Sequence, residues 1–384
     1  MATQPVPSMP YAGPSAPAPA STTHTIDYVG RTGTLYLIFI KNLLLTLVTL
    51  GFYRFWAKTR LRRFLWGNTR VDGEALEYTG TGKELFLGFL KAVVILLPTF
   101  GVLELAEMFF ADSEPVAAGV IAVTRIILVF FLIYAGTFAA RRYRMSRTTW
   151  RGIRFQQLGS MWRYAGLAML GNLLTVLTLT LYGPFNRVRL MRYEMDNLRF
   201  GSGVFRFTGR GKTLFASYLK CWAVGIVALI AAAVATYSLL TFEPEMLWDM
   251  EIWEDPEQAK ELFVAIFKSA ALPIGLLVLI FAALMLWYQA RILRFYAENL
   301  HLESLTFGAP RITGRAIFWL MLSNFLLTMI SLGLLYPVTL QRMMRFLCGR
   351  IELHGPIDVT RITQVERGPR TGEGLAGFFD IDVT

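Results

Sequence analysis

The chain has 384 residues, of which 54% are hydrophobic and only 17% charged, and its mean hydropathy is +0.46. This composition excludes an ordinary soluble domain, and the net charge of +11 lies beside apolar runs, which favours contact with anionic lipid head groups over nucleic-acid binding. Two cysteines and three scattered histidines provide neither a disulfide framework nor metal-ligand spacing, so no metal and no cofactor are expected.

The two ends of the chain differ in composition from the rest. Residues 1–26 are rich in Pro, Ala, Ser and Thr, and residues 363–384 carry glycines and mixed charge, so both are predicted to be flexible tails. Residues 27–362 are predicted to form one repeated transmembrane domain.

Apolar runs dominate that domain, and each approaches the roughly 20 residues that a helix needs to cross a bilayer. The seven clearest runs cover residues 35–53, 85–110, 116–139, 164–182, 214–242, 270–287 and 317–336. A buried helix of a large soluble protein could explain one of them, but not all. The predicted fold is an all-α polytopic membrane protein of about seven helical segments, with short β-hairpins at the interface.

An arginine followed by an aromatic residue recurs at the ends of these runs. The five copies are Arg63-Phe64, Arg142-Tyr143, Arg192-Tyr193, Arg294-Phe295 and Arg345-Phe346. In four copies a second arginine stands three residues earlier, at Arg60, Arg189, Arg291 and Arg342. Residues three apart share a helix face, so we interpret these nine arginines as basic anchors at the membrane interface. The copies at 142 and 192 recur 152 and 153 residues later, which indicates an internal duplication.

Each copy is followed by a segment in which polar and apolar residues alternate. Glycine-containing turns interrupt these segments at Asp72-Gly73, Arg151-Gly152, Gly201-Ser202-Gly203 and Gly355-Pro356. We expect a short hairpin in every copy. Because an isolated two-stranded ribbon is marginal in water, some of the five should pair or stack at the membrane surface.

The pattern Thr-Gly-x-Gly-Lys-x-Leu-Phe opens two of the long runs, at residues 79–86 and 208–215. The second copy resembles a phosphate-binding loop, but G-x-x-x-x-G-K-[ST] requires a glycine where Arg206 stands. We therefore interpret the pattern as a flexible entry into a membrane helix, with a lysine that extends toward the head groups.

Three of the runs contain an asparagine, at Asn42, Asn172 and Asn324. Amides in lipid usually hydrogen-bond to a neighbouring helix, and that is the more common role. Three amides in equivalent positions could instead form one polar cluster near the centre, as a transport site would require.

Charges also occur inside two consecutive runs. Counted from the turn near Ser113, Glu104 is nine residues away and Arg125 is twelve. At about 1.5 Å per helical residue their depths differ by roughly 4–5 Å, so we predict an ion pair across the hairpin. Its role is either structural or part of gating and coupling.

The side of the membrane on which the five copies lie is open to two interpretations. If all runs span, two three-helix units become inverted repeats, as in many secondary transporters. The charges favour one common cytoplasmic side, because residues 54–83 and 186–212 each contain seven Lys or Arg. That arrangement, which we favour, requires the three Asn-containing runs to be re-entrant or shallow.

The phrases NLLLTLVTLGFYRFWAKTRLRRF and NTRVDGEALEYTGTGKELF resemble the YjgN-like family of bacterial inner-membrane proteins, a domain of unknown function. The resemblance covers roughly residues 26–360 and implies an inner-membrane location and a repeated architecture, but no catalytic residue. We expect a small-solute transporter or channel. The alternative is a structural scaffold whose basic hairpins bind anionic lipid or a cytoplasmic partner. No enzyme is expected, because no histidine cluster and no Ser/Lys or Asp/Asp motif is present.

Overall fold

The computed structural model describes residues 23–238 and 255–355 and contains ten helices and ten strands there. Most of both predicted tails lies outside these ranges. Two helices followed by a two-stranded hairpin occur four times in succession, and a fifth helix pair leads to a single strand. The helices are α1 (Thr32–Val48), α2 (Arg54–Gly67), α3 (Gly82–Phe110), α4 (Pro115–Ser146), α5 (Met161–Leu177), α6 (Gly183–Asp196), α7 (Gly211–Ser238), α9 (Pro256–Glu298), α10 (Gly314–Ile330) and α11 (Tyr336–Cys348).

The strands close into one antiparallel barrel in the order β1-β10-β9-β8-β7-β6-β5-β4-β3-β2. They are β1 (Thr23–Tyr28), β2 (Thr69–Val71), β3 (Glu74–Tyr78), β4 (Thr148–Trp150), β5 (Ile153–Gln157), β6 (Leu198–Phe200), β7 (Gly203–Phe207), β8 (Leu300–Leu302), β9 (Leu305–Gly308) and β10 (Glu352–His354). The N-terminal strand closes the barrel: Thr25 is paired with Glu352 of β10 and Tyr28 with Thr69 of β2. β1 therefore includes residues that were predicted to belong to the tail.

The expected helices and hairpins are present, but the expectation of an all-α fold is wrong for the strands, which are joined into one closed barrel. A separate hairpin leaves two strand edges unpaired, and closure into a barrel removes them. Four of the five expected hairpins form, whereas the fifth copy contributes the single strand β10 in the described residues. The predicted Gly355-Pro356 turn extends beyond the described residues, which end at Gly355. Asp72 and Gly73 both have positive φ, at 53° and 80°, as do Arg151 and Gly152, and two such residues form the hairpin turn that fits the twist of the strands.

Apolar side chains fill the barrel over several strands. The Phe155 ring lies 6.4 Å from that of Phe205, and Phe205 lies 6.4 Å from Phe307, although each pair is two strands apart. Neighbouring strands are about 4.8 Å apart, so rings two strands apart come this close where they converge on the inside of the barrel. The same apolar cluster continues into Val188 of α6 and Ile292 of α9, so the barrel and the helix ends share one core.

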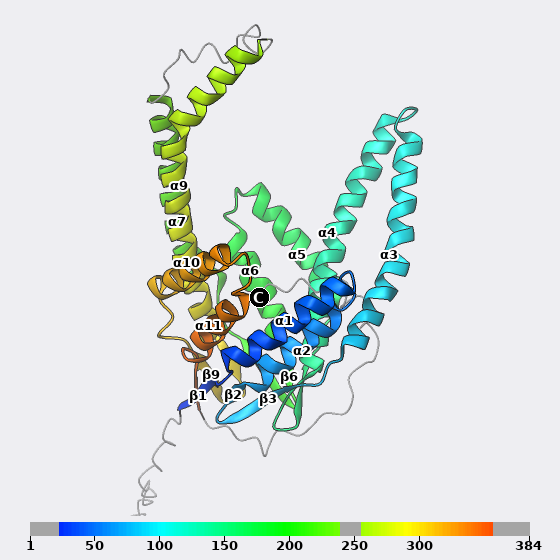
Figure 1. Cartoon of the computed structure of the whole chain (residues 1–384), viewed down its shortest axis with the longest axis vertical. Coiled ribbons are helices and arrows are strands. Elements are labelled where there is room, and N and C mark those ends of the chain that lie inside the picture. The colour runs from blue at the N-terminus through cyan, green and yellow to red at the C-terminus, as the bar shows by residue number, and fades with distance from the viewer. Residues whose placement is uncertain (1–22, 239–254, 356–384) are drawn as a thin grey trace, which may run out of the picture.

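The helices form a ring above the barrel, because each helix contacts the next one along the chain and α11 contacts α1. Figure 1 shows two long hairpins, α3–α4 and α7–α9, extending away from the barrel, while the three shorter pairs end closer to it.

Four of the predicted membrane segments are long enough to span. In the described residues α3, α4, α7 and α9 have the length and composition of membrane-crossing helices. The other three runs, 35–53, 164–182 and 317–336, each form a 17-residue helix that ends in a turn and is followed by a second short helix leading back to the barrel. Because one barrel contains all the strands, the five motif copies lie on one side, as the charge pattern favours. The described residues therefore support neither seven spanning helices nor the inverted-repeat arrangement.

Candidate functional site

The five arginines of the Arg-aromatic pairs are fixed by hydrogen bonds to the backbone. Arg63 donates to the carbonyl oxygen of Gly80 at 2.8 Å, and Arg192 donates to that of Gly209 at 2.7 Å. The others donate to equivalent loops, Arg142 to Gly159, Arg294 to Pro310 and Ile312, and Arg345 to Gly30 at 3.0 Å. In every case the acceptor follows a barrel strand, and for Arg345 that strand is β1. The fold itself therefore positions these basic anchors.

The remaining four anchors lie at the same helix ends. Arg60 stacks over the Tyr53 ring at 5.8 Å, and Arg342 donates to the Ser323 hydroxyl at 2.8 Å. Arg189 and Arg291 are exposed. Together the nine arginines surround the junction of the helices and the barrel, which we call the rim.

The Thr-Gly-x-Gly-Lys pattern caps a helix and allows close packing. The Thr81 hydroxyl accepts a hydrogen bond from the backbone N–H of Glu84 at 3.3 Å and so caps α3. A Cβ atom on Gly82 would lie 2.7 Å from the Trp56 ring, so only glycine fits there. The pattern is thus a fixed junction rather than the flexible entry that we expected.

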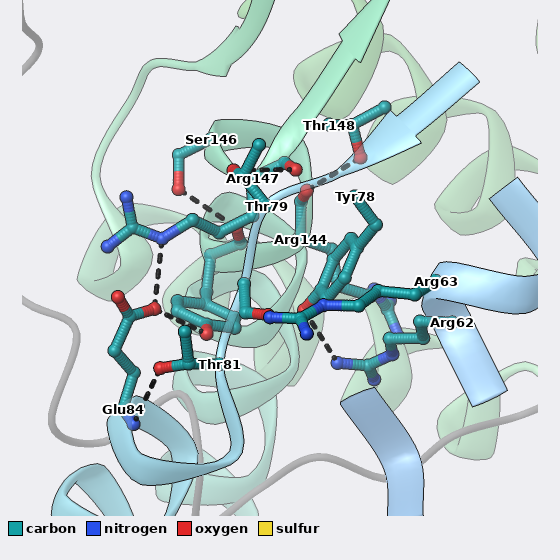
Figure 2. A network of polar contacts seen from close by, with 12 residues as sticks. Arg62, Arg63, Tyr78, Thr79, Thr81, Glu84, Arg144, Ser146, Arg147 and Thr148 are labelled. Atoms are coloured by element: carbon teal, nitrogen blue, oxygen red, sulfur yellow. Dashed lines mark hydrogen bonds and ion pairs between the residues drawn. The ribbon is translucent and has the colours of Figure 1, made fainter. Parts of the chain in front are cut away.

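Glu84, in the first turn of α3, joins this helix to the end of α4 at the rim, as Figure 2 shows. Its Oε2 atom accepts hydrogen bonds from the Tyr143 hydroxyl at 2.8 Å and from Nε of Arg147 at 3.1 Å. Nearby, the buried Arg62 donates to the Tyr78 hydroxyl at 3.3 Å. The sequence analysis did not select Glu84, but the spacing Thr-x-x-Glu is that of a capping box and would have marked it.

A second carboxylate, that of Glu194 in α6, joins this helix to α5 and to α4 of the preceding unit. It accepts a hydrogen bond from the Tyr164 hydroxyl at 2.8 Å and pairs with Arg141 at 3.2 Å. Gln157, only 2% exposed, donates to the Glu194 backbone carbonyl at 2.8 Å. Burial, reinforced by the Glu194 charge, raises the pKa of Tyr164 well above its ordinary value, so this hydroxyl remains a donor. These tertiary contacts left no local signal in the sequence.

The three predicted intramembrane amides are not joined to one another by any hydrogen bond in the described ranges. Asn42 donates to the Ala57 carbonyl and Asn324 to the Thr339 carbonyl, both at 3.3 Å. Asn172 accepts from Asn186 at 3.0 Å. Asn172 also donates to the Tyr134 hydroxyl of α4 at 2.5 Å. The amides therefore hold neighbouring helices together and are not bonded into the single cluster that a transport site would require.

Asn42 nevertheless lines a small pocket. The Asn42 side chain, 9% exposed, has a buried Oδ1 atom without a hydrogen-bond partner. The residue also lines an apolar space of about 30 Å³, together with Tyr336 and Leu340. That volume has room for about one water molecule.

The predicted charged pair is present between α3 and α4. Arg125 contacts Glu104, and it also pairs with Glu107 at 3.0 Å, a partner that the depth count did not include. The guanidinium group thus lies between two carboxylates inside a long apolar hairpin. In the described ranges, no three His, Cys, Asp or Glu side chains are placed to hold a metal ion.

The fold and these sites define a class of protein: a multi-pass helical membrane protein whose ring of helices packs against a closed β-barrel. Most of the arginines and carboxylates described above are paired within the rim and the α3–α4 hairpin. The chain belongs to the family described as "Bacterial protein of unknown function (DUF898)", whose model matches residues 23–378. Its location is the bacterial inner membrane, in agreement with the curated relatives.

Those relatives are inner membrane proteins named YjgN. The protein of Salmonella typhimurium is 32% identical over 81 residues, which cover 21% of this chain and 20% of the relative. The proteins of Escherichia coli O157:H7 and K12 are 29% identical over 133 residues, 35% of this chain and 31% of each relative. The matched segments thus span at most about a third of the relatives. No solved structure matches the chain.

Proposed function

We propose that this inner-membrane protein is a non-enzymatic scaffold whose rim binds anionic lipid head groups. The observation that carries the proposal is the bond that fixes each of the five Arg-aromatic anchors to a loop carbonyl. A guanidinium group has five N–H donors, so one or two backbone bonds leave others for a phosphate. Arginine also matches phosphate geometry better than lysine does.

The charge distribution supports a rim that faces the cytoplasm. Residues 54–83 and 186–212, which surround the rim, each carry seven Lys or Arg, whereas Asp112 and Glu114 lie at the far end of the α3–α4 hairpin. The cytoplasmic leaflet is negatively charged, and each basic residue near it contributes about 1 kcal/mol of attraction. Apolar side chains fill the inside of the barrel, which supports a structural role for the barrel rather than a role in conduction.

We also infer that the helix pairs are copies of one repeated unit. The bond between Arg63 and Gly80, and its counterparts at Arg142 and Arg192, each join residues 17 apart. In the last unit Arg345 donates to the Gly30 carbonyl, which follows β1, so the N-terminal strand supplies the acceptor for the fifth copy.

The lipid proposal is tested by measuring bound phosphatidylglycerol on purified protein by native mass spectrometry. The variant Arg60→Gln/Arg189→Gln/Arg291→Gln removes three exposed rim cations. The matched control neutralises three exposed arginines on barrel strands: Arg70, Arg154 and Arg206. We expect the first variant to lose bound phosphatidylglycerol and the control to retain it. Equal loss in both would attribute binding to net charge alone and contradict a rim site.

Transport of a small solute is the second proposal. Its support is Arg125, which lies between two carboxylates inside an apolar hairpin where charges are usually functional. The three amides are bonded to other groups and, in the described residues, not to one another, which weakens it. Proteoliposomes should show solute or ion flux above that of protein-free vesicles, and Glu104→Gln should reduce it. Flux that is unaffected by Glu104→Gln would show that this charged group is not part of the transport pathway.

A further inference from the structure

The turns between the short helices expose apolar side chains at their ends. Leu50 is 90% exposed, Leu179 74% and Leu332 92%. We call residues 46–53, 174–182 and 327–336 the three tips; none contains a charged residue. Soluble surfaces rarely present such apolar ends, so a non-aqueous partner is needed.

Each tip closes with the same backbone hydrogen bond. Gly51 N–H donates to the carbonyl of Thr46 at 2.7 Å. The equivalent bonds run from Thr180 to Thr175 at 2.7 Å and from Gly333 to Thr328 at 2.8 Å. This six-residue closure satisfies carbonyls that a helix C-terminus otherwise leaves free. The residue at the closing position has positive φ in all three tips, 91° at Gly51, 73° at Thr180 and 86° at Gly333.

A hydroxyl group in each tip bonds to a helix carbonyl and pairs one further backbone N–H. Thr49 Oγ1 donates to the Leu45 carbonyl at 2.7 Å and accepts from the Tyr53 N–H at 2.9 Å. Thr178 repeats both bonds at 2.7 and 3.0 Å, and Ser331 repeats them at 2.6 and 3.0 Å. Water would satisfy these groups on an ordinary surface. In hydrocarbon each unpaired group costs several kcal/mol, so internal pairing is needed only there.

We propose that the three tips are inserted into the hydrocarbon core of the bilayer and that lipid acyl chains cover them. α1, α5 and α10 have 17 residues each, about 25 Å of helix, which is less than the roughly 30 Å hydrocarbon thickness. The chain enters from the barrel side, turns within the bilayer and returns to that side. Charge-free tips with internally paired backbone meet the condition for a turn inside lipid. The inference goes beyond the proposed function, because it requires no preference among head groups.

The test places a single cysteine at Leu50, Leu179 or Leu332 and labels it in detergent with an environment-sensitive fluorophore before reconstitution. The control is a cysteine at Glu74, which is exposed in a barrel hairpin. Both native cysteines, Cys221 and Cys348, are buried. We expect tip labels to be quenched several-fold more by nitroxides on acyl chains than by aqueous iodide, and the control label to show the reverse.

Iodide quenching of the tip labels at the level of the control would overturn the proposal. A second measurement uses Thr49→Val and Thr178→Val, which keep side-chain volume but remove the hydroxyl. Both should lower the unfolding midpoint in bilayers, because the N–H of Tyr53 or Tyr182 loses its partner without access to water. Unchanged midpoints would contradict tips in hydrocarbon. Equal loss of bound phosphatidylglycerol in the rim variant and its control, together with the expected tip quenching, would refute only the rim proposal.

Discussion

Replacement of Gly171 by alanine tests the packing between α5 and α6. A Cβ atom on Gly171 would lie 1.9 Å from Oδ1 and 2.3 Å from Cγ of Asn186, so the Asn186 side chain must move. Its bond to Asn172, 3.0 Å long, would break. Alanine favours a helix by about 1 kcal/mol, whereas overpacking costs about 1–3 kcal/mol and a lost intramembrane bond about 0.6–1.7 kcal/mol. We expect a net destabilisation of roughly 1–3 kcal/mol.

The same helix contains the matched control. No atom lies within 4 Å of a Cβ placed on Gly166, so Gly166→Ala should stabilise α5 by up to about 1 kcal/mol through helix propensity alone. Thermal unfolding of the purified variants, followed by intrinsic tryptophan fluorescence, compares the two. With Asn186→Ala present, Gly171→Ala should cost much less, because the obstruction is absent. Equal midpoints for Gly171→Ala and Gly166→Ala would refute the predicted clash.

Three further outcomes are expected. Arg125→Ala should lower the folded yield in size-exclusion chromatography more than Glu104→Gln, because it leaves two carboxylates unpaired in the hairpin; equal yields would contradict the pairing. Burial raises the pKa of the Cys348 thiol to about 11, so at neutral pH it stays protonated, and mass spectrometry should detect maleimide labelling only after denaturation. Deletion of residues 1–31 removes β1 and should cause aggregation through two open edges, whereas deletion of residues 1–20 retains every described strand.

Patterns within a short segment predicted the local elements. Asp72-Gly73 marked a hairpin turn because two adjacent residues with positive φ favour Asp and Gly. The depth count brought Glu104 and Arg125 together because both lie on helices joined by a short turn. The Arg-aromatic pairs marked the helix ends, but their bonds to loop carbonyls could not be foreseen, because the acceptor depends on where the following hairpin returns.

The sequence by itself determined that this chain belongs in a membrane and where most of the hairpin turns occur, because hydropathy and turn geometry act over a few residues. The charge pattern favoured three apolar runs that turn back, but only the tertiary structure shows where each of them turns. Run 317–336 is nearly as apolar as run 214–242, yet the chain turns at Leu332. It turns there because α11 has to lead back to the barrel, where β10 is paired with β1 and β9. The pairing of β1 with β10 joins Thr23 to His354, 331 positions apart. No local pattern encodes such a contact, because its free energy comes from closing the last open edges of the sheet.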